Sequence, residues 1–228
     1  MFDRIAGVYD PMNLVISAFQ EPRWRKRAVH AAGVRPGDRL LDVATGTGKV
    51  AADLFDRAQP GGTVLGVDIS PRMIASARHR LRARRGLEFV VGDALALPTE
   101  DRGFDAATIA FGMRNLPDYR RGFEEMARSV RPGGRVVCLE IARPRRRLAR
   151  VLQVWFDRIV PLMGRIAGQG PAYGYLVRSV KGYPAPERIA EIMREAGLVG
   201  VTWHGLSGGI VTLHVGTVAD GEPTSTLE

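Results

Sequence analysis

The sequence predicts one α/β domain built on a doubly wound, Rossmann-like sheet that is mostly parallel and ends in an antiparallel C-terminal hairpin strand. Apolar runs of strand length alternate with helical patterns, three of these runs lead into an acid, and the last two are joined as a hairpin. Buried parallel strands appear as near-continuous apolar runs, and their alternation with helices is typical of βαβ units. The 228 residues, 45% of them hydrophobic, are enough for one such domain with a buried core.

The first predicted strand, residues 40–43, leads into a glycine-rich turn at residues 44–48 and a helical pattern at residues 49–58. Glycines after a strand let a ligand approach the backbone, and the N–H groups at the start of the next helix point toward that ligand. Open α/β sheets bind their ligands at this edge. Asp42 would repel a pyrophosphate but attract a cation such as an ammonium group. The turn also fits the dinucleotide fingerprint, which is weak evidence alone, whereas Val43 excludes a P-loop.

Two further predicted strands, residues 63–68 and 87–91, also lead into acids. Asp68 can accept hydrogen bonds from ribose hydroxyls, and Asp93 can reach the exocyclic amine of an adenine. A ligand with an ammonium group, a ribose and an adenine, and with no phosphate required, matches S-adenosylmethionine. The alternative is that each acid only ends a strand or caps a helix, a role that suits Asp68 because Ser70 follows it.

The remaining pattern completes the sheet. Strands are predicted at residues 104–110, 135–141, 198–206 and 210–218, and helices at residues 22–33, 70–85, 118–130 and 187–196. Tight turns are predicted at residues 131–134 and 207–209, the second of which joins a hairpin. A terminal hairpin departs from the dinucleotide-binding fold, whose sheet continues in parallel.

The chain is interpreted as a single domain, residues 1–218, followed by a tail, residues 219–228. The tail lacks apolar periodicity before its last leucine, so it is predicted to be disordered. Residues 1–35 are predicted to form an N-terminal helical arm that acts as a lid, although the first residues also fit a frayed terminus. Residues 142–185 are predicted to be a helical insertion that covers the substrate site.

Composition limits the location and the partners. The single cysteine, Cys138, lies in an apolar strand pattern, and no secretory signal or membrane-spanning run is present, so a cytoplasmic location is expected. A net charge of +9 favours anionic partners, but no basic motif interleaved with aromatic residues suggests nucleic acid. The basic segment 143–150 begins an apolar helical pattern that reaches residue 160. This helix either packs over the sheet with solvated arginines or contacts an anionic membrane.

Together these motifs resemble those of class I S-adenosylmethionine-dependent methyltransferases, and more closely those of the ubiquinone/menaquinone biosynthesis C-methyltransferase family. The similarity spans roughly residues 1–216. It rests on motifs that read here as Phe2-Asp3…Tyr9-Asp10, Phe111-Gly112-x-Arg114-Asn115, Arg131-Pro132-Gly133-Gly134…Leu139-Glu140, Tyr173-x-Tyr175-Leu176-x-x-Ser179 and Gly208-Gly209-Ile210…His214. Two positions depart from the family pattern: Lys49 stands where an acid is usual, and Ala51 where a threonine is common.

The resemblance implies C-methylation of a reduced polyprenyl quinone precursor, either demethylmenaquinol or the benzoquinol of the ubiquinone pathway. It implies that Arg114 holds a phenolate or polarises a water, Asn115 binds a ring oxygen and Tyr9 closes over the ring. His214 titrates in a useful range and is a further catalytic candidate. The implied partner is a prenylated quinol, at the inner face of an anionic membrane and with a homodimer as one option.

The resemblance also implies S-adenosylmethionine as the cofactor, S-adenosylhomocysteine as the product, and no metal. The residues expected to contact the cofactor are those at and beside the acids and the glycine turn: Asp42, Ala44, Gly46, Thr47, Gly48, Asp68, Ile69, Met73, Asp93, Ala94, Ala110 and Phe111.

Three other functions remain open at this point. A methyltransferase acting on another small molecule of secondary metabolism is compatible with the departures at Lys49 and Ala51. An NAD(P)-binding oxidoreductase would use the same glycine turn, but Asp42 and the terminal hairpin oppose it. A non-catalytic scaffold of quinone biosynthesis would bind the cofactor without turnover.

Overall fold

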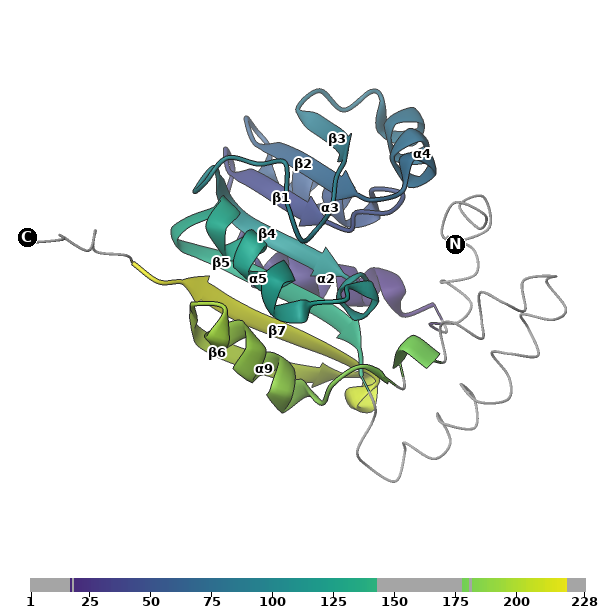
Figure 1. Ribbon diagram of the computed structural model, residues 1–228. Helices are drawn as coiled ribbons and strands as arrows, with labels where there is room; N and C mark the ends of the chain where they lie inside the picture. Colours follow the sequence, from purple (N-terminus) through teal and green to yellow (C-terminus); the bar gives the residue numbers. More distant parts are fainter. Residues whose placement is uncertain (1–16, 18, 143–177, 181, 221–228) are drawn as a thin grey trace, which may run out of the picture.

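A computed structural model describes residues 17, 19–142, 178–180 and 182–220, and a seven-stranded sheet forms its centre (Figure 1). The strand order is β3-β2-β1-β4-β5-β7-β6, and only β7 runs antiparallel to its neighbours. The strands are β1 (Arg39–Val43), β2 (Thr63–Asp68), β3 (Leu87–Val91), β4 (Phe104–Ala110), β5 (Val130–Ile141), β6 (Leu198–Leu206) and β7 (Val211–Val218). The predicted doubly wound sheet with an antiparallel C-terminal strand is confirmed.

Helices cover both faces of the sheet. One face carries α2 (Glu21–Ala31), α3 (Lys49–Ala58) and α4 (Pro71–Leu81), and the other carries α5 (Tyr119–Ser129) and α9 (Pro186–Glu195). In Figure 1, α5 and α9 lie in front of the sheet, with α2 and α3 behind it. Two hydrophobic clusters result, one containing Trp24, Leu54 and Ile74 and the other containing Phe123, Met126 and Met193. Burial of these apolar side chains is the main stabilising contribution.

Two element boundaries differ from the sequence prediction by more than two residues. β5 begins at Val130, before the predicted turn, because Phe104 pairs with Val130 and the register then jumps to Ala106 opposite Arg135. The intervening residues form a bulge rather than a separate turn. α4 ends at Leu81 instead of residue 85. Beyond it, the Arg84 guanidinium donates to the Ala52 carbonyl (3.0 Å) and binds Asp56 (2.6 Å) on α3, so the chain leaves the helical path.

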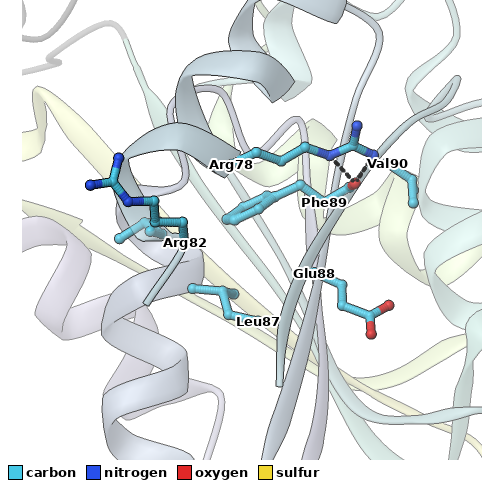
Figure 2. Close-up of a pocket in the computed structure, with 7 residues that line it drawn as sticks. Arg78, Arg82, Leu87, Glu88, Phe89 and Val90 are labelled. Atoms are coloured by element: carbon cyan, nitrogen blue, oxygen red, sulfur yellow. Dashed lines mark hydrogen bonds between the residues drawn. The ribbon is translucent and has the colours of Figure 1, made fainter. Parts of the chain in front are cut away.

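The edge strand β3 is partly closed by a side chain of α4. Nε and Nη2 of Arg78 donate to the Phe89 carbonyl at 3.0 and 2.6 Å (Figure 2). These atoms border a surface hollow of about 390 Å³ between α4 and β3. An edge carbonyl that already has a donor is less able to pair with a strand from another molecule.

Several predicted segments fall largely outside the described residues. They are the first part of the arm at residues 1–35, most of the insertion at residues 142–185, including the basic segment, and most of the tail at residues 219–228. Within the part of the chain that is described, no helix combines the length and apolar character needed to cross a bilayer.

Candidate active site

A cavity of about 290 Å³ opens where the carboxyl ends of β1, β2, β3 and β4 meet. Its wall is formed by the turn after β1, the start of α4, and the segments that follow β3 and β4. Most of the predicted cofactor residues line it: Ala44, Gly46, Asp68, Ile69, Met73, Asp93, Ala94, Ala110 and Phe111, and Asn115 lines it as well. The cavity therefore brings together residues that are up to 73 positions apart, from Ala44 to Pro117.

The turn after β1 is held by backbone hydrogen bonds. Thr45 N donates to the Val67 carbonyl (3.0 Å), and Gly46 N donates to Oδ2 of Asp68 (2.8 Å). Gly46 has a φ of +57°, and no atom lies within 4 Å of the position that a Cβ would take. The Gly46 backbone thus faces open space that a ligand can occupy, and a side chain there would fill it.

Thr47 and Gly48 shape the turn without lining the cavity. Arg80 of α4 donates to the Thr47 carbonyl, and Thr47 is buried. Gly48 has a φ of +79°, and a Cβ there would lie 2.8 Å from the Phe89 ring. Gly46 therefore lines the cavity, where ligand contact stays a prediction, whereas Gly48 is needed for its left-handed backbone and for close packing.

Asp42 lies beneath the turn rather than in the cavity. Its side chain is 1% exposed, and its two carboxylate oxygens accept hydrogen bonds from Thr45 Oγ1 (2.6 Å) and Thr108 Oγ1 (2.7 Å). Burial raises the pKa of Asp42 to about 6, an effect that the two hydroxyl donors partly offset. Asp42 is buried and does not line the cavity, so the expected direct contact with an ammonium group stays a prediction that this geometry does not favour.

Asp68 and Asp93 face the cavity as expected. The oxygens of Asp68 accept hydrogen bonds from Gly46 N (2.8 Å) and Ser70 N (2.9 Å), and Oδ1 of the exposed Asp93 accepts one from Leu95 N (2.9 Å). A carboxylate has about four lone-pair sites, so each acid can still accept from a ligand. Both acids therefore do organise their loops, as the alternative interpretation held, but this role does not exclude ligand binding.

Two non-glycine residues on the cavity wall hold left-handed backbone. Ala44 has a φ of 52° and Phe111 a φ of 57°. Such conformations cost about 1–3 kcal/mol each and are concentrated at functional sites. Between them lies Gly112, where a Cβ would be 2.4 Å from the Ala44 Cβ. The turns after β1 and β4 therefore touch only because residue 112 has no side chain.

Arg114 forms a buried ion pair with Glu140. Its Nη1 lies 2.7 Å from Oε1 of Glu140, and its backbone N donates to Oε2 at 3.1 Å. The Arg114 side chain is 6% exposed and that of Glu140 is fully buried. Removing one partner of such a pair costs about 3–5 kcal/mol. The pair fixes the 3₁₀ turn η2 (Met113–Asn115), whose last residue reaches the cavity while Arg114 itself does not line it.

His214 lies in the core, which corrects its selection as a catalytic candidate. It is fully buried in the middle of β7, opposite Cys138, and its Nε2 is 2.9 Å from the Pro186 carbonyl of α9. Trp203 stacks on the ring at 6.2 Å, and burial lowers the pKa of His214. A neutral imidazole in this position holds α9 to the sheet, because its ring nitrogen donates to a helix carbonyl.

One predicted site residue, Tyr9, lies outside the described residues. Other residues that support the site could not be identified from the sequence. Glu140, Thr45 and Thr108 were missed as supporting residues, although Glu140 belongs to a motif of the resemblance. The departures from the family pattern are accommodated locally: Lys49 Nζ lies 4.0 Å from Oε2 of Glu21 on α2, and Ala51 is fully buried in the hydrophobic cluster on that face of the sheet.

Comparisons with known proteins agree with this geometry. The model of the ubiE/COQ5 methyltransferase family matches residues 1–218. The chain is 45% identical to the demethylmenaquinone methyltransferase of Thermus thermophilus, over 95% of this chain and 99% of the relative. It is 43% identical to that of Roseiflexus castenholzii, over 95% and 91% of the two chains.

Solved structures share the fold. A chain of the complex between the Haloferax volcanii Trm112 methyltransferase activator and a putative methyltransferase superimposes with a TM-score of 0.70 at 21% identity, covering 96% of this chain and 98% of the other. A Thermotoga maritima S-adenosylmethionine-dependent methyltransferase gives 0.66 at 21% identity, covering 95% and 97%. At these identities the likeness concerns the fold alone.

Proposed function

The chain belongs to the ubiE/COQ5 methyltransferase family, and on that premise we propose that it methylates a ring carbon of demethylmenaquinol, with S-adenosylmethionine as the methyl donor. The observation that carries the proposal is the cavity at the carboxyl edge, where the Gly46 backbone, Asp68 and Asp93 converge. Family membership favours methyl transfer over hydride transfer. The names of the relatives favour demethylmenaquinol over the benzoquinol of the ubiquinone pathway.

The residues around the cavity fit the proposed cofactor. Asp68 lies on the cavity wall and can accept hydrogen bonds from ribose hydroxyls, and the exposed Asp93 can accept one from an adenine amine. Met73, Ala94 and Leu95 provide an apolar wall for a ring system. Asp42 supports this site from below, holding Thr45 through the hydrogen bond that joins β1 to its turn.

S-adenosylmethionine supplies an electrophilic methyl carbon when it is bound. The chain has to orient a ring carbon ortho to a hydroxyl toward that carbon and to help remove the phenol proton. Asn115, on the cavity wall, is proposed to donate a hydrogen bond to a ring oxygen. Arg114 is proposed to stabilise the phenolate, with Glu140 holding its guanidinium in place.

An arginine does not act as the base, because its guanidinium stays protonated in proteins. The ion pair with the Glu140 carboxylate holds the guanidinium in place. We therefore propose that a water bound by Arg114, or Tyr9 of the arm, takes the phenol proton. Arg114 then contributes through charge, by favouring the phenolate over the phenol.

The protein is further proposed to act at the inner face of the membrane, because a polyprenyl tail resides in the bilayer. A homodimer stays a prediction, which light scattering on the purified chain would test. The arm and the insertion are proposed to cover the ring during the reaction.

The decisive experiment is transfer of labelled methyl from S-adenosylmethionine to chemically reduced demethylmenaquinone. Label should appear in the quinol with the native chain and with the control Arg120→Ala, whose guanidinium lies on the exposed face of α5. Arg114→Ala should lose at least about a hundredfold in kcat, as expected for removal of a charged donor in a dry site.

Two results would redirect the proposal. Label in soluble phenols but not in the prenylated quinol would identify a methyltransferase of another acceptor. Cofactor binding by calorimetry without label in any acceptor would identify a non-catalytic scaffold.

A further inference from the structure

Within the part of the chain that the structure describes, positive charge is concentrated on one face of the sheet. α2 carries a net charge of +3, α3 is neutral, and residues 71–85, which comprise α4 and the turn after it, carry +6 with no acid. On the other face, α5 at +1 and α9 at −1 cancel. We call the surface of α2, α3 and residues 71–85 the basic face.

The cationic side chains of the two faces also differ in whether they have hydrogen-bond or ion-pair partners. On α5 and α9, Arg120 and Arg188 bind carboxylates of their own helices, and Arg194 donates to the Val201 carbonyl. On the basic face, six exposed cations have no side-chain hydrogen bond or ion pair with any described residue: Arg23, Lys26, Arg27, Arg57, Arg82 and Arg85. In Figure 2, the Arg82 guanidinium points away from β3, whereas Arg78 reaches the Phe89 carbonyl. The basic face therefore presents charge to solvent.

Exposed apolar side chains gather at one border of this face. Among the described residues, the large apolar side chains that are exposed are Phe19 and Ile69 at 67% and Val91 and Val199 at 50%. Ile69 lines the cavity, and Val91 lies opposite Asp68 at the end of β3. Phe19 precedes α2, whose Trp24 lies 6.2 Å from the Phe111 ring at the same edge. Three of the four thus lie at the carboxyl edge, where the cavity opens.

We propose that the basic face docks on an anionic phospholipid bilayer, with Phe19, Ile69 and Val91 entering the headgroup region at its border. Each basic residue near such a surface strengthens binding about fivefold, and apolar side chains beside a basic surface add burial in the interface. A nucleic acid would use the cations but not the three apolar side chains. The inference rests in part on the proposed function, because this orientation brings the cavity to the prenyl tail.

The experiment is co-sedimentation of the full-length protein with phosphatidylcholine vesicles, with or without phosphatidylglycerol. The native chain should bind only the anionic vesicles, and binding should weaken as sodium chloride is raised. Arg82→Glu/Arg85→Glu should lower the partition coefficient by at least about twentyfold. Phe19→Ala should lower it severalfold without changing its salt dependence.

The matched control is Arg120→Glu/Arg188→Glu, which changes the net charge by the same amount on the opposite face. It should retain most of the binding. Equal loss in both double variants, or no binding of the native chain to anionic vesicles at low salt, would overturn the proposal. So would tighter binding to a random RNA than to the vesicles.

A second readout separates this inference from the proposed function. The Arg82→Glu/Arg85→Glu variant should methylate a short-chain acceptor in the absence of vesicles as fast as the native chain. If vesicle binding behaves as expected but no acceptor is methylated, the docking surface stands and the proposed reaction does not.

Discussion

At the scale of single residues, the acids at the strand ends have different roles despite similar positions in the sequence. Asp68 and Asp93 could be predicted as cavity residues, because the end of a parallel strand alone brings them to the binding edge. The burial of Asp42 could not, since it depends on Thr108, which is 66 residues away and on another strand. The Arg114–Glu140 pair, 26 residues apart, escaped prediction for the same reason.

The raised pKa of Asp42 makes a pH-dependent contribution to stability. The folded protein holds this proton up to about pH 6, whereas the unfolded chain releases it near the ordinary value of 3.8. Its contribution to the free energy of unfolding is complete below pH 3.8 and is lost as the pH rises through 6. It amounts to roughly 3 kcal/mol.

Asp42→Asn should therefore flatten the change of unfolding free energy between about pH 4 and pH 7. Urea titrations of the variant and the native chain across this range would measure it. Glu88→Gln, which removes one exposed carboxylate on β3, serves as the matched control. A profile of Asp42→Asn that matches the native one would show that the carboxyl is not the titrating group.

At the scale of elements, the prediction was accurate where a segment's own pattern decides its structure. The bounds of α3, β2, β3, β4 and β6 agree with the sequence analysis. The end of α4 and the start of β5 were misplaced, because they depend on Arg84 reaching α3 and on the pairing of Phe104 with Val130. Periodicity within a segment carries no information about such contacts.

The contact between the turns after β1 and β4 should be sensitive to one methyl group. Gly112→Ala would bring two Cβ atoms to 2.4 Å, so one turn must shift. We expect a loss of about 1–3 kcal/mol in unfolding free energy and a weaker affinity for S-adenosylmethionine, measured by denaturation and calorimetry.

Gly182→Ala is the matched control, because no atom lies within 4 Å of its Cβ position. It should leave both quantities near their native values. Native affinity in Gly112→Ala would mean that the turns adjust without disturbing the cavity.

At the scale of the whole molecule, topology and family could be predicted from motifs, whereas the distribution of charge over the faces required the structure. The sequence contains the arginines of residues 71–85, but only the sheet order shows that α2 and α4 share a face. The basic segment at residues 143–150, which the sequence analysis considered for membrane contact, lies outside the described residues.

Binding of the methyl donor should stabilise the whole fold, because the cavity draws its wall from four strands that are packed together. At about 100 times its Kd, a ligand that binds only the folded state adds about 2.7 kcal/mol, or roughly 5–10 °C in Tm. A thermal scan with S-adenosylhomocysteine should show this shift. NADH at the same concentration should produce none, and an equal shift with NADH would argue for a dinucleotide site.

The left-handed backbone at Ala44 bears on how this chain could be engineered. Glycine adopts that conformation without the penalty of about 1–2 kcal/mol that alanine bears. Selection for heat resistance alone would therefore favour glycine at residue 44. The same change would loosen the turn that lines the cavity. Thermostability therefore favours glycine at residue 44, whereas affinity for the methyl donor favours alanine.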